Sequence, residues 1–235
     1  MKLQTYKREL PFSYALGASN VYELLRAKPT WCRQVWISAD YRDENGRLAA
    51  LCNTHGVPLE LNSRAVKLLS PKENCYAVGV FDKTAAALDP AADHIVLVAP
   101  ADRGNVGTIL RTAAAFAFQQ VIVIDGVDVY HPKVIRAGMG AFFHVDTVVY
   151  DSFGAYQTAA GGRKMYPFLL DGHTDLTAVA PPDAPVSLIF GNEASGLPGE
   201  FHEIGTSVKI DQTSAVDSLS LPMAAAIGAF WFRER

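Results

Sequence analysis

The second half of the chain alternates between short apolar runs and a segment whose apolar residues repeat every three or four positions. Residues 94–99 and 121–124 are typical of buried strands, and residues 105–118 between them are typical of a helix. The apolar residues of that helix share one face: Val106, Ile109, Leu110, Ala113 and Phe116. A strand–helix–strand unit of this length predicts a parallel sheet with a right-handed crossover.

The same pattern continues towards the end of the chain. Further strands are predicted at residues 142–149, 166–170, 186–190 and 207–210, and a closing helix at residues 221–232. An open α/β sheet binds its ligand beyond the carboxyl ends of its strands. We therefore expect the polar segments that follow these strands to gather at one edge of the sheet.

The first part of the chain predicts a smaller α/β domain. Helices are expected at residues 19–27, 45–55 and 63–69, and strands at 34–38, 57–61 and 76–81. Residues 84–93 are small and include a proline, which is typical of a linker. The predicted organisation is a domain at residues 1–83, a linker at 84–93 and a second domain at 94–235.

Composition describes a folded protein that does not span a membrane. The chain has 235 residues, of which 49% are hydrophobic and 19% charged, so it can bury a core. No apolar stretch reaches the roughly 18 residues of a membrane span, and no secretory signal is evident. Cys32, Cys52 and Cys75 lack the spacing of a disulfide framework or a zinc site. A cytoplasmic location with reduced thiols and no bound metal is expected.

The charge is unevenly distributed along the chain. The net charge is -3, but residues 1–83 carry 12 Lys and Arg against 8 Asp and Glu, and residues 84–235 carry 9 against 16. A basic first part favours contact with an anionic partner such as a nucleic acid. The alternative is an ordinary solvated surface.

A glycine-containing segment follows the first strand of the second part. Gly104 and Gly107 allow close approach of the backbone, Asn105 suits a helix cap, and a helix N-terminus can hold an anion. Arg111 lies one to two turns further on, where a guanidinium could bind a phosphate or a ribose oxygen. The alternative is an ordinary capped helix with a surface arginine. The segment is not GxGxxG, which disfavours a dinucleotide fold.

Two more segments carry candidate chemistry. Glu193 lies between Gly191 and Gly196 directly after an apolar strand, which favours a site carboxylate over a solvated turn. The polar stretch 211–217 leads into the last helix, where Asp217 or Ser218 could serve as the cap.

Together the three segments resemble the motifs of the SPOUT-class, TrmH-type (SpoU) RNA ribose methyltransferases. The resemblance is strong over residues 94–235, including 128–141, and looser over the first part, which is similar to a ribosomal-protein-like RNA-binding domain. It implies S-adenosylmethionine-dependent 2′-O-methylation of rRNA or tRNA. It also implies a parallel-sheet domain with a C-terminal trefoil knot, and a homodimer whose interface forms the site.

The resemblance also assigns roles to single residues. Those matching catalytic positions are Asn105, Arg111, Glu193 and Ser218. Those matching cofactor-binding positions are Gly191, Ile210, Leu219 and Ser220. Ser220 stands where the family has Asn, and its hydroxyl cannot replace both the donor and the acceptor of an amide.

The implied chemistry is in-line attack of a ribose 2′-oxygen on a sulfonium methyl group, which mainly requires alignment of the two centres. The counterpart of Arg111 is proposed as the base. A guanidinium has no acceptor, so a role in holding phosphate and stabilising the forming alkoxide is physically easier. Both roles stay open. His131 and His173 are possible bases by residue type or simply structural.

Two alternative functions remain from the residues. The first is a non-catalytic RNA-binding protein of the same fold, which the Ser220 replacement makes credible. The second is an unrelated α/β enzyme for a small phosphorylated metabolite, because glycine-rich loops serve such ligands equally well.

Overall fold

The computed structural model describes residues 3–71, 74–180 and 182–233, which form two compact units. The first unit combines Met1–Thr84 with Asp128–His144, and the second combines Ala85–Val127 with Val145–Arg235. The chain thus leaves the second unit after Val127 and returns at Val145, whereas the sequence predicted one continuous domain from residue 94. Residues 84–93, expected as a linker, contain no helix or strand.

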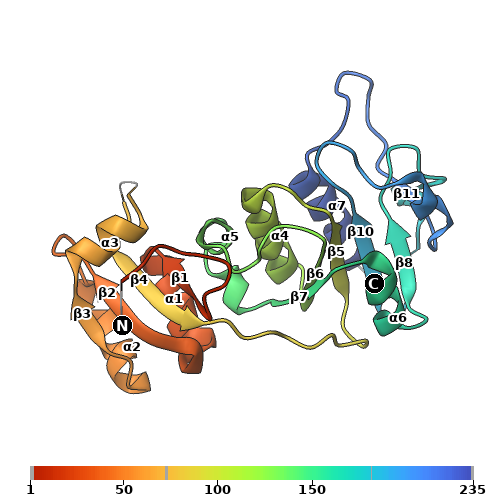
Figure 1. The fold of residues 1–235 in the computed structure, drawn as a ribbon. Coiled ribbons are helices and arrows are strands. Elements are labelled where there is room, and N and C mark those ends of the chain that lie inside the picture. The colour runs from red at the N-terminus through yellow and green to blue at the C-terminus, as the bar shows by residue number, and fades with distance from the viewer. Residues whose placement is uncertain (1–2, 72–73, 181, 234–235) are drawn as a thin grey trace. The chain divides into compact units, whose positions relative to one another are not determined.

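The first unit contains a mixed four-stranded sheet in the order β1-β4-β2-β3 (Figure 1). The strands are β1 (Phe12–Leu16), β2 (Cys32–Ile37), β3 (Leu59–Leu61) and β4 (Ala77–Asp82). β4 is antiparallel to both neighbours, and β2 is parallel to β3. The helices are α1 (Ala18–Ala27), α2 (Arg47–His55), α3 (Ser63–Leu69) and α5 (Pro132–Gly138). The predicted small α/β domain is confirmed at this level.

The strand predicted over residues 142–149 is wrong in its first half. Ala141–Phe143 form a short 3₁₀ helix, and β7 (Asp146–Tyr150) begins only afterwards. The reason is an aromatic cluster in the first unit, in which the Phe143 ring centroid lies 5.3 Å from that of Phe81. Gly140, with φ of 94°, turns the chain between α5 and this cluster.

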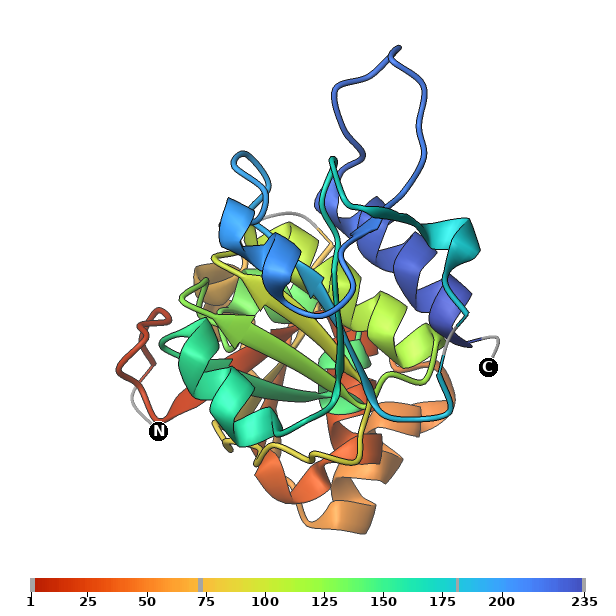
Figure 2. The ribbon, with the colours of Figure 1, turned by 90° about the vertical axis from the view of Figure 1, so that its right-hand side faces the viewer.

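The second unit contains a five-stranded parallel sheet in the order β7-β6-β5-β10-β8. The further strands are β5 (His94–Val98), β6 (Gln120–Ile124), β8 (Lys164–Pro167) and β10 (Val186–Phe190), and the helices are α4 (Arg103–Ala115), α6 (Phe153–Ala160) and α7 (Leu221–Arg233). α7 packs against α4 and β10 (Figure 2). The three central strands, β5, β6 and β10, are almost wholly buried because their apolar residues face helices on both sides. The parallel sheet predicted from the sequence is confirmed.

Two predicted strands differ in their bounds or partners. The strand expected at 166–170 ends at Pro167, and the backbone continues so that the N–H groups of Phe168 and Leu169 bond to Ile189 (2.8 Å) and Val208 (2.9 Å). The strand expected at 207–210 is β11 (Val208–Lys209), which pairs with β9 (Thr174–Asp175) in a separate two-stranded sheet. The last strand therefore lies outside the main sheet.

The three cysteines are free and buried. Burial raises the pKa of Cys32 to about 12 and that of Cys52 to about 11, so both thiols stay protonated at neutral pH. In the part of the chain that the structure describes, no helix is both long and apolar enough to cross a bilayer.

Candidate functional site

The first motif segment turns from β5 into α4. Asp102 caps this helix, because its Oδ1 accepts from the N–H groups of Gly104 (2.6 Å) and Asn105 (2.9 Å). The prediction that Asn105 is the cap is therefore wrong. Asn105 lies inside the first turn, which leaves its side-chain amide available for another contact.

That contact is with Glu193, whose carboxylate joins the first and second motif segments. Its Oε2 accepts from the N–H of Ala101 (2.9 Å), and its Oε1 accepts from the N–H of Asp102 (3.0 Å) and from Nδ2 of Asn105 (3.1 Å). Partial burial alone would raise the pKa of Glu193, but these donors together lower it below its ordinary value. The carboxylate is thus ionised at neutral pH and held in one place.

The loop that carries Glu193 is closed on itself. A Cβ on Gly191 would lie 2.2 Å from the carbonyl carbon of Gly196, so only glycine fits there. Asn192 and Gly196 exchange two backbone hydrogen bonds of 3.1 and 2.9 Å. Nδ2 of Asn192 also donates to the carbonyl of Ala99 (2.8 Å), which fixes the loop to the end of β5. Asn192 was not among the residues predicted from the sequence, although its place beside Glu193 was a usable signal.

A cavity of about 440 Å³ opens beside this loop, within the size range of small-molecule sites. It is lined by residues from three loops and the start of α7: Phe168, Leu169, Leu170, Asp171, Phe190, Gly191, Asn192, Glu193, Ala194, Ser195, Gly196, Leu197, Ile210, Gln212, Ser218, Leu219, Leu221 and Ala224. Five predicted site residues are thereby brought together: Gly191, Glu193, Ile210, Ser218 and Leu219.

The lining of this cavity is suited to a ligand with a flat apolar part and several polar groups. Phe168 stacks on Phe190 with ring centroids 4.5 Å apart, and Leu197 and Leu219 add apolar surface. The Oε1 of Gln212 is buried and has no hydrogen-bond partner among the described residues. A buried acceptor without a partner is costly, so a ligand donor at this point would stabilise the site. Gln212 and the loop 168–171 were not predicted from the sequence.

The other predicted site residues do not line the cavity. Asn105 is connected to the cavity by the hydrogen bond that its Nδ2 donates to Glu193, which does line it. Arg111 is exposed on α4 and makes no hydrogen bond or ion pair with residues that the structure describes. Ser220 directly precedes α7, and its carbonyl accepts from the N–H groups of Met223 (2.9 Å) and Ala224 (3.0 Å). The expectation that Asp217 or Ser218 caps this helix is therefore wrong.

Neither histidine considered as a base lines the cavity. His131 belongs to the first unit, where its Nδ1 accepts from the N–H of Lys133 (3.1 Å) and caps α5. His173 stacks on His202 with ring centroids 4.8 Å apart. Both positions favour structural roles.

Comparison with known proteins connects this site to a family. The model of the SpoU rRNA methylase family matches residues 93–230. A 23S rRNA (guanosine(2553)-2′-O)-methyltransferase of Bacillus subtilis is 29% identical, over 62% of this chain and 60% of its own length. A 23S rRNA (adenosine(1067)-2′-O)-methyltransferase of Streptomyces laurentii is 27% identical, over 77% of this chain and 72% of its own length. The AdoMet-bound rRNA methyltransferase of Sinorhizobium meliloti has a similar structure, with a TM-score of 0.81 and 27% identity over 95% of this chain and 87% of that one.

Proposed function

The chain belongs to the SpoU rRNA methylase family, and we propose that it transfers a methyl group from S-adenosylmethionine to a ribose 2′-oxygen of ribosomal RNA. The observation that carries this proposal is the meeting of the three motif segments. Glu193 of the second segment holds Ala101, Asp102 and Asn105 of the first, beside a cavity that the third segment completes. The related enzymes act on ribose 2′-oxygens of 23S rRNA.

The cavity is the proposed cofactor site. Phe168, Phe190 and Leu219 would supply apolar contacts to the cofactor, the backbone at Gly191 and Ile210 would supply hydrogen bonds, and Gln212 would accept one. The cofactor supplies an activated methyl group. The residues of the protein align the incoming ribose and exclude water, which is where most of the rate gain of such a transfer arises.

Arg111 is the proposed RNA-facing group. Its exposure and lack of an internal partner leave the guanidinium available for a phosphate or for the developing charge on the ribose oxygen. Because a guanidinium has five donors and no acceptor, this electrostatic role is favoured over that of a base. Ser218 lines the cavity and would contact the substrate or the cofactor.

A homodimer is the proposed active form. Met223 and Phe230 on α7 are 55% and 53% exposed, and Phe230 contacts Phe116 at the end of α4. This exposed apolar face suits a second copy of the chain. A site completed at the interface would also explain why Arg111 does not line the cavity of its own chain.

The remaining parts of the proposal concern the whole chain. The family resemblance is the basis for proposing a trefoil knot in the second domain, which we place at residues 94–235. The basic residues 1–83 are the proposed RNA-binding domain, connected by residues 84–93. A ribosomal substrate also agrees with a cytoplasmic location.

Transfer of labelled methyl groups from S-adenosylmethionine to unmodified ribosomal RNA tests the proposed function. We expect label in a 2′-O-methylated nucleoside with the native chain, and at least a hundredfold slower transfer with Arg111→Ala, as for loss of one electrostatic group in a site. Cofactor affinity, measured by calorimetry, should stay within a few fold, and Lys164→Ala, at an exposed position of β8 in the second unit, serves as the control. Cofactor binding without transfer to any RNA would favour the non-catalytic alternative, and absence of cofactor binding would favour a metabolite enzyme.

A further inference from the structure

The first unit has a large open groove that the proposed function does not use. Its volume is about 900 Å³. It is lined by residues of α1, of α2 with the turn before it, and of the turn after α5: Ala18, Ser19, Tyr22, Glu23, Arg26, Tyr41, Arg42, Glu44, Arg47, Ala50, Leu51, Met139, Gly140, Ala141 and His144. Its side chains include two tyrosines, three arginines and two glutamates.

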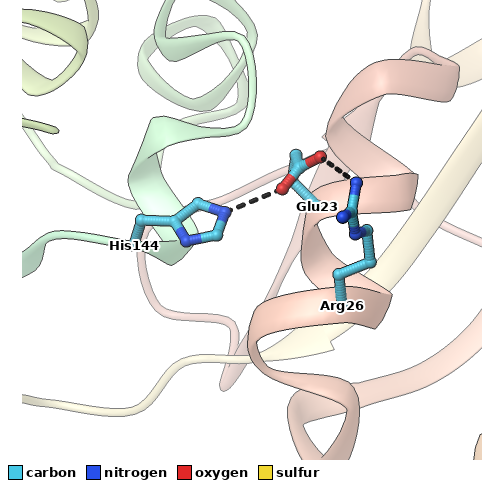
Figure 3. Close-up of polar contacts among 3 residues, drawn as sticks. All are labelled: Glu23, Arg26 and His144. Carbon is cyan, nitrogen blue, oxygen red and sulfur yellow. Dashed lines mark hydrogen bonds and ion pairs between the residues drawn. The ribbon is translucent and has the colours of Figure 1, made fainter. Parts of the chain in front are cut away.

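One wall of the groove is a built structure. Gly140, with φ of 94°, packs so closely on α1 that a Cβ there would lie 2.5 Å from Cγ of Glu23. The carboxylate of Glu23 lies between two cationic or polar partners, with Oε2 2.7 Å from Nε2 of His144 and Oε1 3.5 Å from Nη1 of Arg26 (Figure 3). Glu23 thereby joins α1 to the turn after α5, and its negative charge interacts with these two partners in the wall.

Two aromatic rings also line the groove, that of Tyr22 on α1 and that of Tyr41 in the segment before α2. The hydroxyls of Tyr22 and Tyr41 lie 3.5 Å apart, and both side chains are half-buried. Burial, followed by the contact with Tyr22, raises the pKa of Tyr41, so its ring stays neutral and does not repel an anion. The nearby carboxylate of Asp43 is engaged by the N–H groups of Leu48 and Ala49, each at 3.0 Å.

The groove charges that make no ion pair with a described residue are two arginines and one glutamate. Arg42 and Arg47 are exposed and make no ion pair with residues that the structure describes. The acidic residues lining it are Glu23, held as above, and Glu44. The whole first unit carries 14 Lys and Arg against 9 Asp and Glu, while the second carries 7 against 15. An anionic ligand is therefore favoured at this groove.

We propose that this groove binds an unpaired nucleotide of the RNA substrate, with the base against Tyr22 and Tyr41 and the phosphates at Arg42 and Arg47. Aromatic side chains recognise RNA by stacking on bases that have left the helix, and arginines bind the neighbouring phosphates. A duplex cannot present its bases in this way. An acidic peptide would satisfy the arginines but has no flat group for the rings. The proposal rests on the proposed function, since it assumes an RNA substrate, and it adds a second contact for choosing that RNA.

Fluorescence anisotropy with the full chain tests the groove. The probes are a labelled ten-nucleotide single-stranded RNA and the same sequence in a perfect duplex, each titrated at several KCl concentrations. We expect tighter binding of the single strand. Arg42→Gln combined with Arg47→Gln should flatten the plot of log affinity against log salt by about 1.4, because each lost phosphate contact in a single strand removes about 0.7 from the slope.

The aromatic contact has its own variants. Tyr41→Leu should weaken single-strand binding about tenfold, which is within the range for loss of one stacking ring, and leave the salt slope unchanged. Tyr41→Phe keeps the ring and should restore affinity to within about twofold of the native chain. The control, Arg64→Gln with Lys67→Gln on exposed positions of α3, makes the same charge change in the first unit but outside the groove, and should flatten the slope by less than the groove pair does.

Any of three results would overturn the proposal for the groove. The first is an equal change of the salt slope in the α3 control, and the second is equal affinity for the single strand and the duplex. The third is binding of the single strand by Tyr41→Phe that is as weak as by Tyr41→Leu. Thermal melting identifies any variant that is unfolded, and the arginine pair still tests the site if Tyr41→Leu is one of these. Methyl transfer is measured separately. A chain that binds unpaired RNA through the groove but transfers no methyl group contradicts the proposed function alone.

Discussion

Glu193 is held by three donors, and this has a consequence for pH. Its pKa in the folded chain is lowered, so its contacts stabilise the fold above the ordinary value of 4.5 and this contribution is lost as pH falls through the lowered value. Glu193→Gln keeps the size of the side chain, but it places an amide NH₂ group, which cannot accept a hydrogen bond, opposite N–H donors. We expect this variant to melt below the native chain at pH 7, with the difference shrinking below pH 4.5.

The control for this experiment is Glu200→Gln, an exposed carboxylate in the same unit. It should melt with the native chain throughout the range from neutral to acidic pH. A difference for Glu193→Gln that stays constant with pH would mean that packing, rather than charge, stabilises the loop.

Ser220 is the motif position at which the chain departs from its family. It is exposed, and its carbonyl accepts the first backbone hydrogen bonds of α7. Asn and Ser are equally good at the start of a helix, and an exposed position avoids the overpacking cost of about 1–3 kcal/mol. We therefore expect Ser220→Asn to melt like the native chain, with methyl transfer unchanged or mildly faster. A folded, cofactor-binding variant without transfer would show that the serine is required.

At the scale of elements, the loop 191–196 tolerates little change at its first residue. Gly191→Ala would place a methyl group 2.2 Å from the Gly196 backbone, and backbone cannot move aside as a side chain can. We expect a loss of stability of about 1–3 kcal/mol or more, together with weaker cofactor binding. Gly199→Ala is the matched control, because an added Cβ meets nothing within 4 Å there. Calorimetry and melting should separate the two variants clearly.

Local pattern predicted the type of most elements but not all of their ends. The α4 helix was expected from residue 105 because Asn suits a cap, but Asp102 suits it equally, and only the position of Glu193 decides between them. The run 142–149 looks like a strand because buried 3₁₀ and strand residues are equally apolar. Its Phe143 packs on Phe81, a contact across more than sixty positions of sequence that no local period contains.

At the scale of the whole molecule, the motifs predicted which loops meet, since strands of a parallel sheet end at one edge. They could not predict Gln212 or Asp171, because the cavity also depends on where the non-motif loops pass. Nor did they place residues 128–144 in the first unit. Removing residues 1–83 would therefore remove Phe81, a ring partner of both Phe142 and Phe143. Substitutions in the groove are a cleaner test of RNA binding than that truncation.

The proposed dimer gives the last prediction. Phe230 is 53% exposed on α7, beside Phe116 of α4. A charge in the centre of an apolar interface would be buried without a partner, which is strongly unfavourable, whereas the same charge on a monomer surface would be solvated. We expect Phe230→Glu to elute as a monomer by light scattering at micromolar concentration, and to lose methyl transfer because the interface completes the site.

Leu61→Glu is the control, since Leu61 is 70% exposed in the first unit, away from α4 and α7 in the sequence. It should remain dimeric. A cooperative thermal transition of Phe230→Glu, together with a cofactor affinity that is reduced but not abolished, would show that the variant has lost its assembly and kept its fold. A native chain that is monomeric and active would contradict the dimer, and Arg111 would then have to reach the substrate from its own subunit.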